Sequence, residues 1–433
     1  LVFLYAHDFS AHLGTGGRWS AKKILRMMDL AYQSGSPVIG LNHSAGARFE
    51  EMGGGDLGGG YGFAQQFYKI AHYSGAIPQI SLMMGDNAGG GVYGPGMTDF
   101  ILATKQSNLF MAGPALVKSV IGEEIGVREL GGAGMHASVS GVVHVLTEND
   151  EDCIKKAREL LSFLPSNCRE VPPVVNTGDD PKRLCPELNQ VVPVNHRVPF
   201  DMHEVIKIIV DSGHFFEIHR DYARNIIVGF ARFNDHTAAI IASNSLFKAG
   251  AVTVDAAEKA ARFIRFSDAF NIPLVYLLDS PAYMVGSQQE RAGLITRGTK
   301  LIYATAEATV PKITVLIRKA LGASSLAMGS QELGGDVVYA WPIADMSGLS
   351  PESVADIVYQ SEIRQSPNPE ETRRLKVEQC RKELGDIYAA ASWQNVNDMI
   401  EPAETRMAII RALEMTRYKV KTLPLKKHSN IPL

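Results

Sequence analysis

This chain of 433 residues contains few cysteines and has a formal net charge of only −3. Its four cysteines, Cys153, Cys168, Cys185 and Cys380, form no CxxC pair. A disulfide framework is therefore not expected, and an intracellular location, the cytoplasm or the mitochondrial matrix, is favoured. Lys and Arg number 43 against 46 Asp and Glu. Because there is no basic excess, we expect no binding to nucleic acid.

Long apolar runs and metal-binding motifs are also missing. No apolar stretch approaches the roughly 20 residues that a membrane span needs, so none is expected. The 12 histidines form no HxH or HExxH pattern, so no metal is expected in this subunit. The chain begins at Leu1 rather than Met, and LVFLYAHDF resembles a buried strand entered midway. We therefore expect that the start of the natural protein is missing.

Strand-like apolar runs alternate with helical patterns along most of the chain, which is typical of an α/β fold with largely parallel sheets. A helix is predicted to start with Ser20 as its N-cap and to stop at Gly35. NIIVGFARF and TAAIIAS predict a pair of strands. Seven of the 21 prolines fall within 165–199, which indicates an extended linker. The predicted domains are residues 1–190 and 191–433.

The second half of the chain repeats two elements of the first half. PVIGLNHSAGAR (37–48) parallels PLVYLLDSPAY (273–283) at an offset of 236. IPQISLMMGDNAGGG (77–91) parallels VPKITVLIRKALGAS (310–324) at an offset of 233. Buried parallel strands resemble one another in composition, so chance likeness is the alternative. We expect a duplication that gives two related α/β domains, with a site at a domain or subunit interface.

Glycine-rich turns after strands are the candidate site. Gly89, Gly90 and Gly91 follow one strand, and SAGAR, residues 44–48, follows another. Glycine lets backbone N–H groups approach a ligand closely, and such groups stabilise an enolate or a tetrahedral oxyanion. Arg48 can bind a phosphate or carboxylate, or can pair with a neighbouring glutamate. No pair of carboxylates identifies a general acid and base.

Three other motifs were weighed. The GxGxxG match at Gly89–Gly94 is not followed by an acidic residue about 20 positions on, so a dinucleotide site is rejected. Ser44 is not in a nucleophile elbow, because Asn42 stands where GxSxG needs glycine. The stretch GGGDLGGG, 53–60, predicts a mobile loop that is either a lid or an ordinary surface loop.

Seven stretches that span nearly the whole chain match one known family. They are SPVIGLNHSAGARFEE, GAIPQISLMMGDNAGGGVYGPGMTDF, LGGAGMHASVSGVVH, FFEIHRDYARNIIVGFARFN, ARFIRFSDAFNIPLVYLLDSP, LIYATAEATVPKITVLIRKA and KKHSNIPL. On these stretches the chain resembles the carboxyltransferase (β) subunit of biotin-dependent acyl-CoA carboxylases, of the propionyl-CoA carboxylase type. Related decarboxylases share the pattern. The resemblance implies two duplicated crotonase-like domains, each a β-β-α spiral, in a hexamer built as a trimer of dimers.

The resemblance also implies the chemistry of a ligase complex. Acyl-CoA would bind the N-domain of one subunit, and biotin on a carrier protein, supplied by a biotin carboxylase partner, the C-domain of its dimer mate. Carboxybiotin would release CO2, the biotin nitrogen would take the α-proton, and the enolate would attack CO2. The implied residues are Gly46, Ala47, Gly89 and Gly90 in the thioester oxyanion hole, Ala282, Gly322 and Ala323 in the biotin oxyanion hole, and Ser44, Arg48 and Gly91 in substrate binding.

The chain departs from the family pattern at the second hole. Pro281-Ala282 and Gly322-Ala323-Ser324 stand where Pro-Gly and Gly-Gly-Ala are usual. If these turns need positive φ, alanine costs roughly 1 kcal/mol or more relative to glycine, and transfer to free biotin is expected to be weak. The alternatives are an acyl-CoA decarboxylase or another enolate enzyme that no longer uses biotin, a weakly active structural subunit of a mixed hexamer, and, most distantly, a serine hydrolase.

Overall fold

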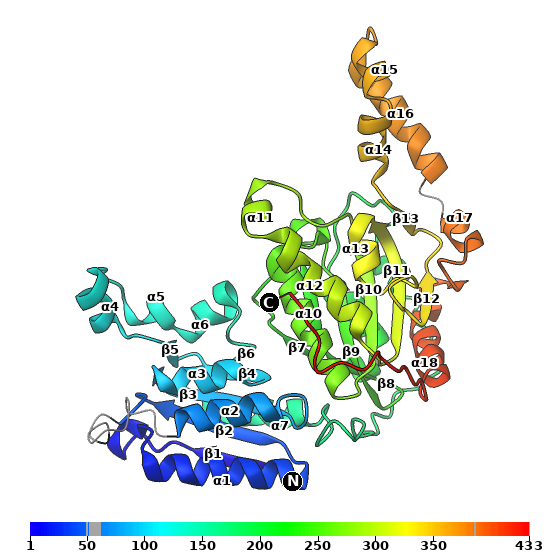
Figure 1. The fold of residues 1–433 in the computed structure, drawn as a ribbon. Helices are drawn as coiled ribbons and strands as arrows, with labels where there is room; N and C mark the ends of the chain where they lie inside the picture. The colour runs from blue at the N-terminus through cyan, green and yellow to red at the C-terminus, as the bar shows by residue number, and fades with distance from the viewer. Residues whose placement is uncertain (49–50, 52–61, 385–386, 433) are drawn as a thin grey trace. The chain divides into compact units, whose positions relative to one another are not determined.

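The computed structural model describes residues 1–48, 51, 62–384 and 387–432 (Figure 1). The chain divides into two compact units: residues 1–173 with 216–222 and 269–271, and residues 174–215 with 223–268 and 272–433. The stretch 53–60, for which a mobile loop is predicted, lies outside the described residues. Residues 174–190 cluster with the second unit. The domain boundary after residue 190 stays a prediction.

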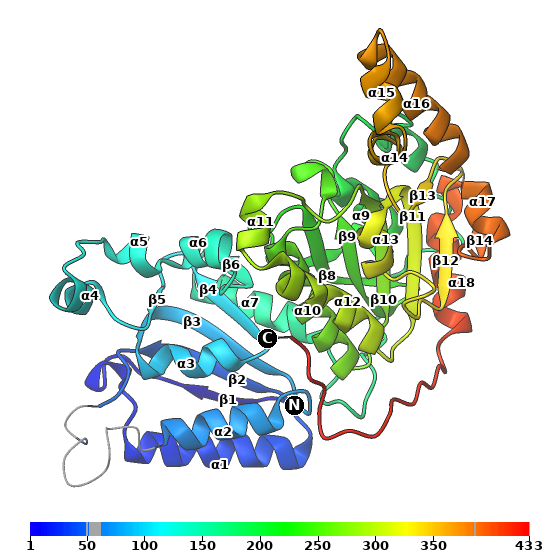
Figure 2. The same cartoon turned by 45° about the horizontal axis from the view of Figure 1, so that its top comes forward.

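A parallel sheet forms the centre of the first unit. Its strands have the order β1-β2-β3-β4-β6, and β5 pairs with β3. Helices α1 and α2 lie side by side (Figures 1 and 2) and pack through Ile24, Met28 and Ile70. The strands are β1 (Phe3–Ala6), β2 (Val38–Ser44), β3 (Gln79–Ala88), β4 (Phe100–Thr104), β5 (Asn108–Phe110) and β6 (Val145–Thr147); the helices are α1 (Arg18–Ser34), α2 (Phe63–Tyr73), α3 (Gly90–Met97), α4 (Pro114–Ile121), α5 (Val127–Gly131), α6 (Ala133–Met135) and α7 (Asp150–Leu161).

The first long helix, α1, begins earlier than predicted. Its N-cap is Gly17, and the predicted N-cap, Ser20, is the third helical residue. The Ser20 hydroxyl accepts the N–H of Gly17 at 2.9 Å. A polar side chain at this position makes the reciprocal bond of a capping box, so the sequence signal for a cap was displaced by three residues. The predicted stop is confirmed, because Gly35 ends the helix with φ +62°.

A second sheet forms the centre of the second unit. Parallel strands run in the order β14-β12-β11-β10-β9, β13 pairs with β11, and β8 pairs antiparallel with β9. The strands are β7 (Phe215–Ile218), β8 (Ile226–Phe233), β9 (His236–Ser243), β10 (Leu274–Ser280), β11 (Lys312–Leu321), β12 (Val337–Ala340), β13 (Asp345–Ser347) and β14 (Asp398–Met399); the helices are α8 (Leu188–Val191), α9 (Met202–Ile209), α10 (Val254–Ala269), α11 (Ser287–Arg291), α12 (Leu294–Glu307), α13 (Gly322–Ala327), α14 (Pro351–Val358), α15 (Gln360–Gln365), α16 (Pro369–Leu384), α17 (Ile387–Ser392) and α18 (Thr405–Met415).

The strands of the second unit follow from its continuous apolar runs. Every residue of β8 and β10 is buried, as expected of strands covered on both faces. The predicted strand pair is confirmed as the hairpin β8–β9, whose turn residues Asn234 and Asp235 have φ of +49° and +69°. Asparagine and aspartate tolerate this conformation, which two-residue hairpins require. Helices α9 and α18 contribute Val205, Ile209 and Ile409 to the main core.

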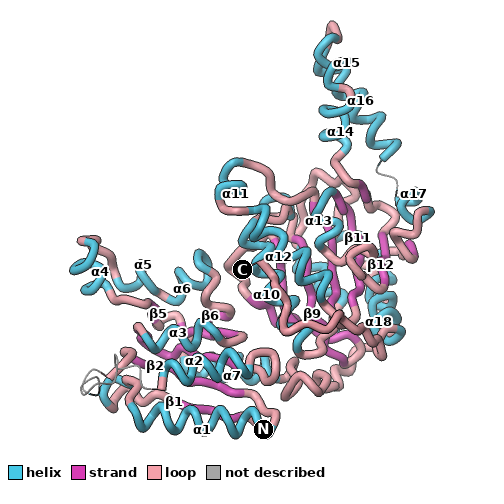
Figure 3. The backbone as a smooth tube through the Cα atoms, viewed as in Figure 1, coloured by secondary structure: helices cyan, strands magenta, loops and turns pink. Residues whose placement is uncertain are grey.

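Two segments are not part of the layers of either unit. Residues 165–187 are loop (Figure 3), as the prolines predicted, but the predicted linker 165–199 also contains the short helix α8. Helices α14, α15 and α16 form an arm that extends away from the sheet (Figures 1 and 2) and is held by a small cluster of Ala355, Val377 and Cys380.

The internal duplication is confirmed in the backbone geometry of the two units. Strands β2 and β10 are related by the offset of 236, and β3 and β11 by the offset of 233. The left-handed run at 12–14, with φ of +52°, +53° and +64°, recurs at 248–250 with φ of +49°, +55° and +77°. An isolated parallel bridge joins Gly16 to Ala47, and its counterpart joins Val252 to Tyr283. Agreement at single hydrogen bonds is much stronger than a likeness of apolar composition.

Candidate functional site

The first turn follows β2 and contains Gly46 and Ala47. Gly46 has φ +100°, and its N–H is donated to the Ser44 hydroxyl at 3.2 Å. The bridge uses the groups on either side of Ala47, since Gly46 O accepts the N–H of Gly16 at 2.7 Å and Gly16 O accepts that of Arg48 at 3.0 Å. The N–H of Ala47 has no acceptor among the described residues, and Ala47 is half-buried.

The second turn joins β3 to α3 at Gly89 and Gly90. Gly89 has φ +51° and ψ −122°, a conformation that other residues rarely adopt. Its N–H is donated to Phe110 O at 3.2 Å. Gly90 is the first residue of α3, and its N–H finds no acceptor in the described part of the chain. A free N–H at a helix start favours negative charge nearby.

The two turns of the first unit touch. A Cβ added to Gly46 would lie 2.8 Å from Ala88 O and 3.6 Å from the N atom of Gly90. Gly46 therefore has no room for a side chain, and its left-handed φ excludes one independently. The result is a half-buried surface with two free donors, Ala47 N–H and Gly90 N–H. Such donors can stabilise an oxygen that gains negative charge during a reaction.

The three predicted substrate-binding residues have intramolecular partners. Ser44 is buried and accepts the N–H of Gly46. Arg48 donates to Thr15 O at 3.1 Å and pairs with Glu51 at 3.1 Å. A Cβ added to Gly91 would lie 3.0 Å from Ser44 O, so this glycine allows α3 to approach β2. The substrate-binding role of Ser44, Arg48 and Gly91 stays a prediction.

The corresponding turn of the second unit repeats this hydrogen bonding. Ala282 O accepts the N–H of Val252 at 3.0 Å, and Val252 O accepts that of Met284 at 2.8 Å. Tyr283 therefore occupies the place of Ala47, and Ala282 occupies that of Gly46. Tyr283 is not among the predicted site residues, although it lies at the offset of 236 from Ala47, and the role of Ala282 stays a prediction. Its side chain is held in place because its hydroxyl donates to Gly298 O at 3.0 Å. Burial also raises the pKa of Tyr283.

The remaining turn of the second unit lies between β11 and α13. Gly322 has φ +61° and corresponds to Gly89. Neither Ala282 nor Ala323 is among the residues with positive φ. The condition under which alanine was expected to strain the second hole is therefore not met. The position that needs positive φ has kept its glycine, and this removes the physical reason for expecting weak transfer to free biotin.

We therefore predict that the double replacement Ala282→Gly and Ala323→Gly changes little. The rate of carboxyl transfer to free biotin is expected to stay within about threefold of the parent, because neither alanine is in a conformation that glycine favours. Steady-state rates with free biotin, measured on both proteins, check this. A rise of tenfold or more would show that the two methyl groups obstruct the site.

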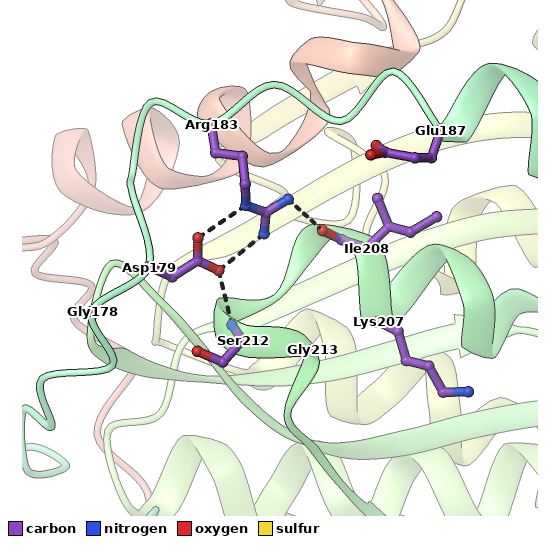
Figure 4. Close-up of a pocket in the computed structure, with 8 residues that line it drawn as sticks. All are labelled: Gly178, Asp179, Arg183, Glu187, Lys207, Ile208, Ser212 and Gly213. Atoms are coloured by element: carbon purple, nitrogen blue, oxygen red, sulfur yellow. Dashed lines mark hydrogen bonds and ion pairs between the residues drawn. The ribbon is translucent and has the colours of Figure 1, made fainter.

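A pocket lies elsewhere in the second unit (Figure 4). It has a volume of about 510 Å³ and contains no predicted site residue. Two of its charged residues are paired with each other: Arg183 donates to both oxygens of Asp179, at 2.9 and 3.0 Å. This guanidinium lowers the pKa of Asp179 to about 2. The pairing indicates a structural role for these two residues.

Neither a metal centre nor a membrane span is found in the part of the chain that the structure describes. No group of three or more His, Cys, Asp or Glu side chains there is arranged to hold a metal ion. None of the helices described is both long enough and apolar enough to cross a bilayer.

Known proteins resemble this chain over its whole length. Residues 1–431 match the family model described as the carboxyl transferase domain. The propionyl-CoA carboxylase carboxyltransferase subunit of Haloferax mediterranei is 45% identical over 433 residues, which are 100% of this chain and 83% of that protein. The methylmalonyl-CoA decarboxylase subunit alpha of Veillonella parvula is 45% identical over 434 residues, with coverage of 100% and 83%.

A solved structure also resembles this chain over nearly its whole length. The transcarboxylase 12S structure, described as a hexamer with methylmalonyl-coenzyme A and methylmalonic acid bound, superposes with a TM-score of 0.94. It is 40% identical in sequence, and the match covers 99% of this chain and 82% of that one. The predicted resemblance, fold class and enzyme class are confirmed by these matches.

Proposed function

The chain belongs to the carboxyl transferase domain family, and from that premise we propose that it transfers a carboxyl group between biotin and the α-carbon of a short acyl-CoA, methylmalonyl-CoA being the carboxylated form. The observation that carries the proposal is the repeated geometry of the two units. In the first unit the N–H groups of Ala47 and Gly90 have no acceptor among the described residues, and the same holds for their counterparts in the second unit, Tyr283 and Ala323. Two such pairs suit a reaction in which two different oxygens need stabilisation.

We assign Ala47 and Gly90 to the thioester oxygen. When the α-carbon gains or loses a carboxyl group, the thioester passes through an enolate whose charge lies largely on this oxygen. Two preorganised N–H donors stabilise that charge more than they stabilise the neutral thioester, which lowers the barrier. The intramolecular bonds of Gly46 and Gly89 hold the two turns and leave the neighbouring N–H groups available.

We assign Tyr283 and Ala323 to the ureido oxygen of biotin. This acceptor is uncharged in the resting cofactor, so N–H donors without a fixed counter-charge fit it. Val285 and Leu326, which are 84% and 44% exposed, provide apolar surface beside these turns for the hydrocarbon parts of the cofactor. When bound, biotin carries the carboxyl group and supplies a nitrogen that accepts a proton. The role of this chain is to bind and orient the ureido group.

We further propose the assembly and partners that the relatives suggest. The solved 12S relative is described as a hexamer, and a trimer of dimers would pair the acyl-CoA half of one subunit with the biotin half of its mate. A biotin carboxylase with its carrier domain would supply carboxylated biotin. An intracellular location stays a prediction. Sedimentation of the full chain should show an oligomer, and an active monomer would contradict the shared site.

The direct test is carboxyl transfer by the full chain. Methylmalonyl-CoA labelled in its free carboxyl group is incubated with free biotin, and in parallel with a biotinylated carrier domain, and label on biotin is measured. We expect biotin-dependent formation of propionyl-CoA with label on biotin. Loss of CO2 without any biotin would favour the decarboxylase alternative. No turnover with either form of biotin would reject the proposal and favour a structural subunit.

A further inference from the structure

The strands that lead to the turns are irregular in both units. Pairing shifts register between Asn42 and Ser44 in the first unit, and between Leu278 and Ser280 in the second. Such a shift leaves backbone groups without their ladder partners and lets the strand bend. Contacts other than the ladder must therefore fix the residues just before each turn.

A single amide side chain does this in the first unit. Asn87 is fully buried, and its Oδ1 accepts the N–H of Ser44 at 3.1 Å. Its Nδ2 donates to Asn42 O at 3.3 Å and to Gly85 O at 2.9 Å. Asn87 thus ties β2 to β3 on both sides of the register shift. Ser44, held in this way, accepts the N–H of Gly46 at the turn.

A buried ion pair takes this place in the second unit, where Ala320 corresponds to Asn87. Asp279 and Arg318 are both 0% exposed, and Arg318 Nη2 lies 2.7 Å from Asp279 Oδ2. The other carboxylate oxygen accepts the N–H of Lys319 at 3.2 Å. The carboxylate therefore bridges β10 and β11 across the shift, three residues before Ala282.

The other terminal nitrogen of the Arg318 guanidinium, Nη1, binds the segment 193–198. Arg318 Nη1 donates to the carbonyl oxygens of Pro193, Asn195 and Val198 at 3.0, 3.2 and 2.9 Å. The guanidinium also lies 4.5 Å from the ring centroid of Phe200. A planar fork with five N–H donors can serve a carboxylate and several carbonyls at once, and the ammonium of lysine cannot.

The first unit has no counterpart of this ion pair. His43 corresponds to Asp279, and Gly85 corresponds to Arg318. A Cβ on Gly85 would lie 2.4 Å from His43 Nε2, so the imidazole occupies the space that a side chain would take. That ring stacks on Phe9 at 3.9 Å between centroids. The two units therefore fix the corresponding strand ends before their turns by different side-chain contacts.

We propose that the Asp279–Arg318 pair is a positioning device for the biotin-side turn, as Asn87 is for the thioester-side turn. Neither pair member touches substrate; each acts by fixing the backbone that carries the free N–H groups. The inference rests on the proposed function for the identity of the two ligands. It adds that a substitution in the Asp279–Arg318 pair weakens the use of biotin and not of the acyl-CoA. A substitution of Asn87 weakens the use of the acyl-CoA and not of biotin.

The test compares Arg318→Lys with Asn87→Ala in the full chain. Arg318→Lys keeps the positive charge but loses the planar set of guanidinium N–H donors. Because a misplacement of about 1 Å can cost around 100-fold in rate, we expect kcat/KM for free biotin to fall about 10- to 100-fold. The KM for methylmalonyl-CoA should stay within about threefold. Asn87→Ala should have the opposite effect: it should raise the KM for methylmalonyl-CoA and leave kcat/KM for free biotin nearly unchanged. Equal effects of both variants on both substrates would overturn the proposal.

Arg406→Lys is the matched control, because Arg406 forms another fully buried pair in the same unit, with Asp211 at 2.6 Å. It should lower stability without a biotin-selective change. Amide hydrogen exchange gives a readout that does not depend on activity. Arg318→Lys should speed exchange at Met284, whose N–H is bonded to Val252 O, and Arg406→Lys should not; equal exchange in both would overturn the positioning role. Failure of the parent to transfer carboxyl groups would reject the proposed function alone.

Discussion

Replacing Gly90 by proline is expected to lower the turnover of carboxyl transfer about 10²–10³-fold relative to Gly90→Ala, the range typical for one lost oxyanion donor. Proline removes the free N–H of this residue. The helix should tolerate it, because Gly90 is the first residue of α3, where proline is common. Steady-state turnover with methylmalonyl-CoA and free biotin measures the effect.

Alanine at position 90 is the matched control. A Cβ there would come within 2.8 Å of the Phe63 ring in either variant, so both carry the same crowding from this atom. Only the proline variant lacks the N–H, and it also carries the rest of its ring next to Gly89. The ratio of the two turnover numbers therefore removes the effect of the Cβ from the comparison. A difference below tenfold between two well-folded variants would mean that Gly90 is not in the oxyanion hole.

Replacing Arg406 by methionine is expected to destabilise the protein by about 3–5 kcal/mol, the range found when one partner of a buried ion pair is removed. Arg406 and Asp211 are both 0% exposed and lie 2.6 Å apart. Without the guanidinium, the Asp211 carboxylate stays buried beside the dipoles of Thr177, Asn234 and Asp235 and loses its paired cation. Urea unfolding at a fixed subunit concentration measures the change.

Arg373→Met provides the comparison with an exposed pair. Arg373 and Asp356 form two contacts of 2.7 Å, but both side chains are 46% exposed. Water screens such a pair, so its loss should cost less than about 1 kcal/mol. Adding Asp211→Asn to Arg406→Met should recover part of the lost stability. If Arg406→Met is as mild as Arg373→Met, the buried pair does not hold the unit together.

The strands and the duplication could be predicted from the sequence because burial dictates composition. Strands such as β10 are covered on both faces, so they are apolar throughout, and the same offset relates them to β2. The place of the glycine turns followed from the same alignment. Gly89 and Gly322 were identifiable because a backbone position with positive φ strongly favours glycine.

The identity of the free donors could not be predicted, because it depends on partners far away in the sequence. Gly46 and Gly89 look as available as Ala47 and Gly90 until Ser44 and Phe110 are seen to accept their N–H groups. Asp279 and Arg318 also look like ordinary charged residues at strand ends, since only the fold shows that they are buried against each other.

Arg318 donates hydrogen bonds to the carbonyls of Pro193, Asn195 and Val198. These bonds restrict where residues can be inserted into or deleted from this chain. Three carbonyls within six residues must reach one guanidinium, so an inserted or deleted residue would break at least one bond and displace the others. The hairpin turn at Asn234 and Asp235 has no such tie to the turns of the site. Insertions and deletions among relatives of this protein should therefore occur in surface loops and avoid the 193–198 stretch, although that stretch belongs to the proline-rich segment 165–199.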